Sequence, residues 1–269
     1  MSEKISVIMS VYNCEAYLRE SIDSILAQTY DNWEFVICND ASTDGTQAVL
    51  DEYKAKYPDK FILISNETNK HLAFSLNHCL QYVTGDYVAR MDGDDISVPE
   101  RFAKELAFLK SHPEIDLVGS LMRRFNDNGM ADVMNAKEYP DKYDMRNGPP
   151  MFHATIMTYK RVYDALGGYT VSKRTVRSQD YDLWFRFFAA GYRPCNLQEA
   201  LYLVREDMNA IKRRTFKVRW NGFKTTRIGY KMLGFPKRWL IKVFFVMLFK
   251  SIIPYRLYHL YRRLQSKRR

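Results

Sequence analysis

The sequence lacks the features that mark secreted, disulfide-bonded or membrane-spanning proteins. Its four cysteines are far apart and form no C-x-x-C pair, and Cys38 and Cys79 lie in apolar runs, as reduced core residues of a cytosolic protein do. Near the start, a strand-like run of only seven residues (5–11) precedes polar ones, so no signal peptide is expected. The apolar stretch 239–253 has fifteen residues, two of them lysines, whereas a membrane span needs about 20 apolar residues. A membrane-spanning helix is therefore not expected.

Acidic residues are absent from position 208 onward. The segment 208–269 holds 18 Lys and Arg residues and no Asp or Glu, while the whole chain has 41 basic and 31 acidic residues and a net charge of +10. Removing those 18 leaves 23 basic against 31 acidic residues in 1–207, a net charge of −8. Surfaces of opposite charge suit different partners. We therefore expect a folded domain over 1–207 and a basic tail over 208–269, with no repeat or Gly/Ser linker.

Strand and helix patterns alternate four times in the first 111 residues. Short runs rich in β-branched and apolar residues are each followed by apolar residues at helical spacing. Such alternation predicts βαβ units and a mostly parallel sheet flanked by helices, an α/β fold. The length of 269 residues fits one large domain of this class with an appendage. The expected strands are 5–11, 33–38, 61–65 and 87–91, and the expected helices are 15–28, 47–57, 73–83 and 99–111.

Acidic loops follow the second and the fourth expected strands. Because ligands bind at the carboxyl ends of strands in open α/β sheets, both loops are expected to face one crevice. Carboxylates crowded at the end of a buried strand repel one another and lose hydration, which a divalent cation would offset. Carboxylate oxygens suit Mg²⁺ or Mn²⁺ and leave coordination positions for substrate phosphates. The acidic residues are Asp40 and Asp44 in the first loop and Asp92, Asp94 and Asp95 in the second.

Each loop also has a simpler interpretation. Asp40 and Asp44 can form Asx turns or cap the following helix, and Asp95 or Ser97 can cap the helix after the second loop. The functional alternative gives one carboxylate of the first loop to a nucleobase, because Asp accepts the imide N–H of uracil. Taken alone, the first loop favours the turn, and the second leaves both interpretations open.

The second half of the chain predicts further elements. A strand is expected at 116–121, a hairpin-like turn at 125–129, and a helix at 160–166 that ends at a Gly-Gly pair. Apolar residues at helical spacing over 183–188 predict another helix, with Asp180 at its start. A carboxylate there is favoured by the helix dipole, so Asp180 taken alone is interpreted as an N-cap.

Six segments in order make a family resemblance specific. Together they resemble the inverting family 2 glycosyltransferases of bacterial polysaccharide synthesis, which have the GT-A fold, over about residues 4–205. One Asp-x-Asp pattern alone would be weak evidence. The segments are ISVIMSVYN (5–13), NDASTDGT (39–46), ARMDGDD (89–95), HATIM (153–157), GGY (167–169) and QDYDLW (179–184).

That resemblance implies roles for the matched residues. Asp180 would be the catalytic base, and Asp94 the direct ligand of a divalent cation, Mn²⁺ or Mg²⁺, with Asp92 nearer the ribose and the metal. The family usually has Glu-Asp where this chain has Gln179-Asp180, which puts an acceptor role of that Glu in question here. His153 resembles a recurrent His of the bacterial members, for which an acceptor or diphosphate site and a structural hydrogen bond are both open. The residues implied in nucleotide-sugar binding are Ser10, Val11, Tyr12, Asp40, Arg90 and Asp92.

The implied reaction is one displacement that inverts the anomeric carbon. A cation offsets the charge developing on the leaving nucleoside diphosphate, and a carboxylate on the opposite face takes the proton of the acceptor hydroxyl. No covalent intermediate is needed, so the absence of a Ser/His/Asp or Cys/His constellation is no objection. UDP is the expected carrier, with dTDP and GDP open, and the acceptor is a glycan or a polyprenyl-diphosphate-linked saccharide.

Two other functions compete with this one. A nucleotidyltransferase that makes nucleotide-sugars shares the sheet and the acids, but needs a Gly-rich basic loop after the first strand, and residues 11–15 contain neither Gly nor a basic residue. A non-catalytic membrane or nucleic-acid binding protein would rely on the basic tail. No RNA-binding signature accompanies that tail, and the acidic body argues against a nucleic-acid partner.

The apolar stretch 239–253 suits a helix lying in a membrane interface. Lys242 and Lys250 fall about 80° apart on a helix, with Arg238 nearby, so a basic edge would face anionic headgroups. Tyr, Arg and Lys residues over 255–269 would add anchoring. The alternative is a helix packed on the catalytic domain. We favour the membrane, and expect a cytoplasmic protein peripheral at the inner face of the cell membrane, where a lipid-linked acceptor would lie.

Overall fold

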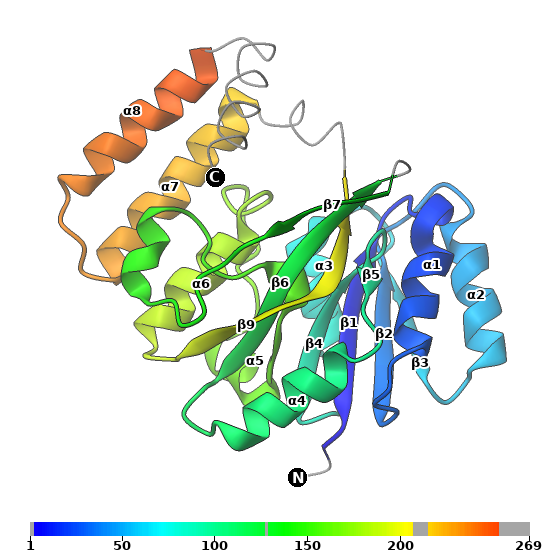
Figure 1. The fold of residues 1–269 in the computed structure, drawn as a ribbon. Helices are drawn as coiled ribbons and strands as arrows, with labels where there is room; N and C mark the ends of the chain where they lie inside the picture. Colours follow the sequence, from blue (N-terminus) through cyan, green and yellow to red (C-terminus); the bar gives the residue numbers. More distant parts are fainter. Residues whose placement is uncertain (1–2, 127–128, 207–214, 253–269) are drawn as a thin grey trace.

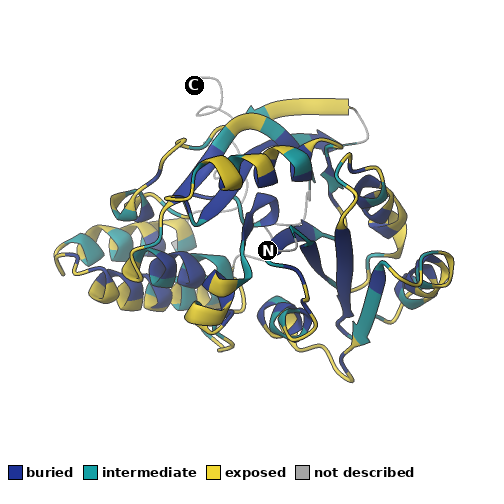
Figure 2. Cartoon of the chain, turned by 90° about the horizontal axis from the view of Figure 1, so that it is seen from below, coloured by how far each residue is buried: buried dark blue, intermediate teal, exposed yellow. Residues whose placement is uncertain are grey.

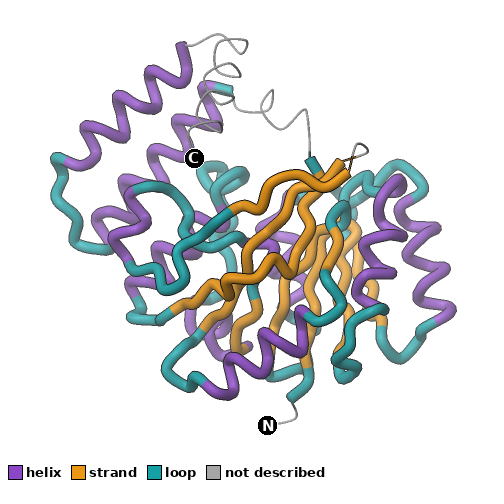
Figure 3. Tube along the Cα trace, in the orientation of Figure 1, coloured by secondary structure: helices purple, strands orange, loops and turns teal. Residues whose placement is uncertain are grey.

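The computed structural model describes residues 3–126, 129–206 and 215–252, and within these ranges one sheet forms the centre of the molecule (Figure 1). Its nine strands follow the order β3-β2-β1-β4-β8-β6-β9-β5, with β7 paired to β6. Helices lie around this sheet (Figure 3), so the expected α/β class is confirmed. The strands are β1 Ile5–Val11, β2 Trp33–Asn39, β3 Phe61–Ser65, β4 Tyr87–Asp92, β5 Ile96–Ser97, β6 Leu117–Asn126, β7 Gly129–Met134, β8 Met157–Tyr159 and β9 Pro194–Arg205. The α-helices are α1 Glu15–Leu26, α2 Thr46–Lys56, α3 His71–Leu80, α4 Arg101–Ser111, α5 Lys160–Leu166, α6 Gln179–Ala189, α7 Phe216–Met232 and α8 Trp239–Ile252.

The N-terminal half of the sheet is parallel, as expected. β1 lies between β2 and β4 and pairs in parallel with both, and β3 extends the ladder beyond β2. Side chains alternate between the faces: Val7 and Met9 pack with α1, α2 and α4, whereas Ile8 packs with α3, α5 and α6. Figure 2 shows the buried strands between helices with exposed outer faces. Burial on both faces explains why these strands are apolar throughout.

The second half of the sheet is mixed. β8 runs antiparallel to both β4 and β6, whereas β6 and β9 are parallel with shifts in register. The expected turn at 125–129 joins β6 to β7, which pair Asn126 with Gly129, and residues 127–128 lie outside the described ranges. The long strand β9 and the very short strands β5 and β8 have no counterpart among the predicted strands.

The predicted end of α5 and the predicted state of the cysteines agree with the structure, whereas the predicted ends of α3 differ from it. α5 ends at Gly167 in the left-handed conformation, with φ +67°, as the Gly pair predicts. α3 begins two residues and ends three residues earlier than predicted. All four cysteines are unpaired, and Cys38 and Cys79 lie buried in the core.

α7 and α8 form a helical hairpin beside α6 (Figure 1). α7 approaches α6 closely at Gly229, where an added Cβ would lie 2.1 Å from the ring of Phe185. α8 packs on α7, where the Phe244 ring meets Trp220 and Phe223. In the described part of the chain, no helix combines the length and apolar character needed to cross a bilayer. The division into 1–207 and 208–269 stays a prediction, and the segments 207–214 and 253–269 lie outside the described ranges.

Candidate active site

The two acidic loops leave the sheet at the same edge. In the parallel ladders Val11 pairs with Asn39 and Ser10 with Asp92, so the chain leaves β1, β2 and β4 side by side. The Asp40 N–H donates to the Val11 carbonyl oxygen at 2.8 Å, which joins the first loop to the end of β1. This backbone geometry agrees with the expectation of one crevice.

Asp40 is buried at the end of β2 and holds the loop that leads into α3. Asp40 is only 2 % exposed. Its Oδ1 accepts hydrogen bonds from Asn66 Nδ2 at 2.7 Å and from the Lys70 N–H at 2.8 Å. Oδ2 accepts the N–H of His71 at 2.8 Å. Because a carboxylate oxygen has two lone pairs, Oδ2 keeps one acceptor direction for a ligand. A role in base recognition therefore stays open beside the structural one.

Asp44 has the turn role that its position before a helix suggested. Its Oδ1 accepts the Thr46 N–H at 3.1 Å and its Oδ2 accepts the Glu15 N–H at 3.2 Å, which connects α2 to α1. Gly45 occupies the N-cap position of α2. Asp44 serves this turn and does not line the cavity that Asp40 lines, so we assign it no part in the reaction.

Arg90 is buried beneath the second acidic loop. It is 1 % exposed, and its Nη2 lies 2.5 Å from Asp92 Oδ1. Burial is the largest influence and disfavours the charged guanidinium, but the Asp92 carboxylate together with Tyr202 and Tyr169 outweighs it, so the Arg90 pKa is raised. Nε and Nη1 of Arg90 have no hydrogen-bond partner within the described ranges. A buried guanidinium is suited to hold anionic oxygens, and here Nη2 holds the carboxylate of Asp92.

Asp94 and Asp95 complete the acidic cluster. Asp94 is exposed, yet the surrounding protein removes part of its hydration and the Asp92 charge adds repulsion, so its pKa is raised. Asp95 is 4 % exposed, and burial together with the charges of Asp92 and Asp94 raises its pKa to about 8. Its Oδ1 accepts the Arg205 N–H at 2.8 Å. The capping interpretation is wrong for Asp95, because α4 begins at Arg101 with Glu100 as N-cap.

These acids fit a divalent cation. Burial is the main cause of the raised pKa values of Asp94 and Asp95, and repulsion among the carboxylates adds to it. A cation between Asp92 and Asp94 would relieve that repulsion. No three His, Cys, Asp or Glu side chains of the described residues gather closely enough to enclose a metal ion. A cation would therefore rely on two carboxylates and on substrate oxygens, as Mg²⁺ commonly does.

A cavity of about 390 Å³ brings the strand ends and α6 together. Ser10, Tyr12 and Asp40 line it from the ends of β1 and β2, while Gln179 and Asp180 line it from the start of α6. Residues far apart in the sequence thus meet in a space large enough for part of a nucleotide-sugar. Other predicted site residues do not line this cavity: Val11, Arg90, Asp92, Asp94 and His153.

Asp180 lies in the first turn of α6, and the N-cap position predicted for it belongs to Ser178. Asp180 is half-buried, and burial raises its pKa, although the N–H groups of Tyr181 and of Asp180 itself and the Arg90 charge oppose that rise. A carboxylate with a raised pKa inside a cavity is a stronger base than a free one. Beside it, Gln179 Oε1 is buried without a hydrogen-bond partner among the described residues.

His153 makes the structural hydrogen bond that was one of its two interpretations. Its Nε2 lies 2.8 Å from the Tyr169 hydroxyl, which lies 2.8 Å from the Tyr163 hydroxyl. Its ring also meets Trp184 edge-on. Burial, followed by the charge of Arg90, lowers the His153 pKa well below its usual range. His153 is therefore neutral at physiological pH, and an acceptor role for it stays a prediction.

The sequence did not predict that β9 is hydrogen-bonded to the acidic loop. The Asp92 N–H donates to the Tyr202 hydroxyl at 3.1 Å, and Arg205 Nε donates to the Asp94 carbonyl at 3.0 Å. Sequence reasoning also missed two basic side chains: Arg177, which lines the same cavity as Asp180, and Lys173, which lines another cavity that Arg177 also lines. Their signal was available in the stretch Lys-Arg-Thr-Val-Arg at 173–177.

An α/β sheet with acidic loops around a cavity at its strand ends is typical of a nucleotide-dependent enzyme. The family model described as Glycosyl transferase family 2 matches residues 6–176. The chain belongs to this family and is a glycosyltransferase, which confirms the resemblance of the six segments.

Relatives include proteins of polysaccharide biosynthesis. EpsE of Bacillus subtilis (strain 168), which carries the name of a glycosyltransferase, is 52 % identical over 213 residues, or 79 % of this chain and 77 % of EpsE. The amylovoran biosynthesis glycosyltransferase AmsE of Erwinia amylovora is 28 % identical over 86 % of this chain and 88 % of AmsE. The Escherichia coli UDP-Glc:α-D-GlcNAc-diphosphoundecaprenol β-1,3-glucosyltransferase WfaP is 26 % identical over 75 % of this chain and 78 % of WfaP.

Two solved structures share the GT-A fold. S. aureus TarS 1–349 in complex with UDP-GlcNAc superposes with a TM-score of 0.70 at 20 % identity, over 85 % of this chain. The match covers 66 % of the TarS chain, so this chain spans slightly less than two thirds of its length. The mannosyltransferase PcManGT from Pyrobaculum calidifontis, in complex with GDP-Man and Mn²⁺, gives a TM-score of 0.65 at 18 % identity over 97 % of this chain and 79 % of PcManGT.

Proposed function

We propose that this glycosyltransferase moves a sugar from a UDP-sugar to a hydroxyl of a lipid-diphosphate-linked saccharide, with inversion and with Asp180 as the base. One observation carries the proposal: Asp180 lines the same cavity as Ser10, Tyr12 and Asp40, although α6 lies far along the chain from β1 and β2. A donor at the strand ends and an acceptor over α6 would meet across this cavity.

The donor assignment rests on the strand ends. Ser10, Val11, Tyr12 and Asp40 would hold the base and ribose, and Tyr12 is 47 % exposed, so its ring is accessible for stacking. The free acceptor direction on Asp40 suits the imide N–H of uracil. The solved relatives were captured with UDP-GlcNAc and with GDP-Man, and the name of WfaP specifies UDP-Glc. Thymine has the same imide N–H and guanine also offers a ring N–H, so Asp40 alone does not select the carrier. UDP is our choice because the sugar bound to TarS and the donor in the name of WfaP are both UDP-sugars.

Asp180 would take the proton of the acceptor hydroxyl. As that proton passes to the Asp180 carboxylate, the acceptor oxygen forms a bond to the anomeric carbon. The bond from that carbon to the donor diphosphate breaks, and its electron pair leaves with the nucleoside diphosphate. The burial that raises the pKa of Asp180 makes it a better base for this step. Gln179 Oε1, unpartnered among the described residues, would accept a hydrogen bond from another acceptor hydroxyl.

Asp92 and Asp94 would hold Mn²⁺ or Mg²⁺. When bound, such a cation supplies electrostatic stabilisation for the charge on the departing diphosphate. Arg90 orients the Asp92 carboxylate from below through the 2.5 Å contact. PcManGT, in complex with Mn²⁺, has the same fold, which supports a cation-dependent reaction here.

The acceptor assignment and the location rest on α8. Its residues Ile241, Phe245 and Phe249 recur every four positions and are 59 %, 63 % and 67 % exposed. They therefore form one apolar stripe on the side of α8 that is turned away from α7, with Lys242 and Lys250 beside it. An apolar stripe with a basic border suits the interface of an anionic membrane. We place the protein at the cytoplasmic face of the cell membrane, and the acceptor of WfaP, named as a diphosphoundecaprenol saccharide, supports a lipid-linked acceptor.

The test is donor hydrolysis and transfer with a panel of UDP-, dTDP- and GDP-sugars, analysed by mass spectrometry. We expect one UDP-sugar to be consumed, with UDP released and the sugar added to a lipid-diphosphate-linked acceptor. Release of pyrophosphate from a nucleoside triphosphate and a sugar phosphate would instead identify a nucleotidyltransferase. Consumption of none of the donors, with liposome binding intact, would identify a non-catalytic membrane protein.

A further inference from the structure

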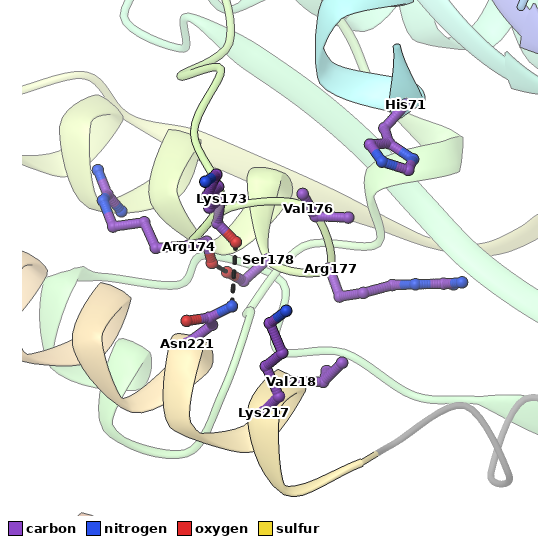
Figure 4. A pocket seen from close by; sticks show the side chains of 9 residues that line it. All are labelled: His71, Lys173, Arg174, Val176, Arg177, Ser178, Lys217, Val218 and Asn221. Carbon is purple, nitrogen blue, oxygen red and sulfur yellow. Dashed lines mark hydrogen bonds between the residues drawn. The ribbon is translucent and has the colours of Figure 1, made fainter. Parts of the chain in front are cut away.

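A second cavity adjoins the catalytic one, and we call it the basic pocket. It has a volume of about 320 Å³ and lies between the loop 172–178 and the first turns of α7 (Figure 4). His71, Val176 and Arg177 line both cavities, so Arg177 lies at their junction. None of the residues that line the basic pocket is acidic.

The basic pocket holds positive charge that the described residues do not neutralise. Arg174 is paired, because its Nη1 lies 2.6 Å from Asp182 Oδ1, and Figure 4 shows its side chain pointing away from Lys217 and Arg177. Lys173, Arg177 and Lys217 form no ion pair with a carboxylate of the described ranges. Lys173 and Lys217 line the pocket, and Figure 4 shows the Arg177 side chain extending away from both lysines. An anion in the pocket would offset the repulsion between these like charges.

The backbone around the basic pocket is held in place and adds to its positive potential. Ser178 is the N-cap of α6, and Lys217 lies in the first turn of α7, so two helix N-termini meet at the pocket. Asn221 Nδ2 donates to the Lys173 carbonyl oxygen at 3.0 Å, which ties the loop to α7 (Figure 4). The cations therefore stand on a scaffold that exists before a ligand arrives.

We propose that the basic pocket binds the diphosphate group of the lipid-linked acceptor, an inference that rests on the proposed function. The donor diphosphate belongs at the acidic loop, where a cation would hold it, and no residue of β1, β2 or β4 lines the basic pocket. An acceptor whose diphosphate occupies this pocket would place its first sugar past Arg177 and next to Asp180. Its lipid would continue along α7 toward the apolar stripe of α8.

The experiment measures binding of geranyl diphosphate to the full-length protein by titration calorimetry. The test variant replaces Lys173 and Lys217 by Gln, and the matched control replaces Lys224 and Lys231, which are exposed on α7 and line neither cavity. Both variants lose two positive charges. We expect the test variant to bind geranyl diphosphate at least about tenfold more weakly than the wild type, because two charge-assisted contacts are lost. We expect the control to bind it like the wild type.

Binding of UDP distinguishes the acceptor diphosphate from that of the donor. We expect the test variant to bind UDP within about twofold of the wild type, and saturating UDP to leave geranyl diphosphate bound. Displacement of geranyl diphosphate by UDP would assign the pocket to the donor and overturn the inference. Equal losses in the test and control variants, or no binding by the wild type, would also overturn it. If the wild type still hydrolyses a nucleotide-sugar in those cases, the inference alone fails; if it consumes no donor, the proposed function fails.

Discussion

Replacement of Asp180 by Asn separates a catalytic role from a structural one. Asn has nearly the same shape and still accepts a hydrogen bond, but it cannot remove a proton at neutral pH. We expect the transfer rate to fall by about 10²–10⁴, the usual contribution of a general base, which corresponds to about 3–5 kcal/mol in the barrier. UDP affinity should change little, because the proposed base and ribose contacts come from the ends of β1 and β2.

The structure indicates that this substitution leaves the fold intact. Ser178, and not Asp180, is the N-cap of α6. The lost interaction of a first-turn carboxylate with the helix dipole is worth about 0.3–1 kcal/mol, and relief from burying the charge opposes that loss. The free energy of unfolding of Asp180→Asn should therefore stay within about 1 kcal/mol of the wild type. Because burial raises the pKa of Asp180, the acid limb of the wild-type kcat/KM profile should lie above the value near 4 of a free carboxyl group.

Asp182 supplies the matched control on the same helix. Its carboxylate holds Thr170, Arg174 and Arg186, so Asp182→Asn should lower the free energy of unfolding by about 2–3 kcal/mol, less than for a fully buried pair because both arginines are partly exposed. Its transfer rate per folded molecule should fall less than about tenfold, since no proton transfer is lost. The assay is transfer measured beside thermal unfolding and UDP binding. Transfer by Asp180→Asn within a fewfold of the wild type would refute the reasoning.

Three further predictions follow from the acids, from α8 and from a buried ion pair. Asp94→Ala, like EDTA, should abolish transfer and weaken cation-dependent UDP binding, and full activity in either case would contradict the metal assignment. Replacing the stripe Ile241, Phe245 and Phe249 by Ser should release the protein from anionic liposomes in a sedimentation assay without unfolding it, and unchanged sedimentation would contradict the membrane assignment. Burial raises the pKa of Glu105 from 4.5 to about 7 despite its pairing with Arg101, so the folded state holds this proton more tightly than the unfolded state. As the pH rises from 4.5 to 7, the unfolding free energy of the wild type should fall by up to about 3 kcal/mol more than that of Glu105→Gln, and parallel profiles in chemical denaturation would contradict this.

The parallel half of the fold was predictable because its signals are local. Apolar runs and helical spacing identify β1 to β4 and the helices between them, and the rule on strand ends then brings Asp40 and Asp92 to one edge. β9 was not predictable in this way. It contacts the acidic loop from 110 residues further along the chain, through Tyr202 to Asp92 and through Arg205 to Asp95. No spacing rule connects segments so far apart, and the shifted register between β6 and β9 hides the alternation of side chains.

The choice between two roles for one residue also needed coordinates. Asp40 and Asp44 look alike in the sequence, since each stands in a polar loop before a helix. In the structure Asp44 accepts two nearby backbone N–H groups and does not line the cavity, whereas Asp40 lines it and keeps one acceptor direction on Oδ2. Asp180 resembled an N-cap, and only the position of Ser178 shows that the cap lies two residues earlier. The hydrogen-bond partners of each carboxylate decide between a capping role and a functional role, and the sequence alone does not show those partners.

The opposite charges of the two proposed diphosphate sites have a consequence for how the substrates should bind. At the acidic loop, the carboxylates of Asp92 and Asp94 would repel a donor diphosphate, so the proposed donor site should need a cation. The basic pocket attracts an anion directly, and its cations Lys173 and Lys217 are exposed, so salt screens them. Removing divalent cations should therefore weaken UDP binding and spare geranyl diphosphate, whereas raising NaCl should weaken geranyl diphosphate more. Opposite charges at the two proposed sites would keep the donor diphosphate at the acidic loop and the acceptor diphosphate in the basic pocket. A displacement at Asp180 needs this separation, because the acceptor must approach opposite the leaving group.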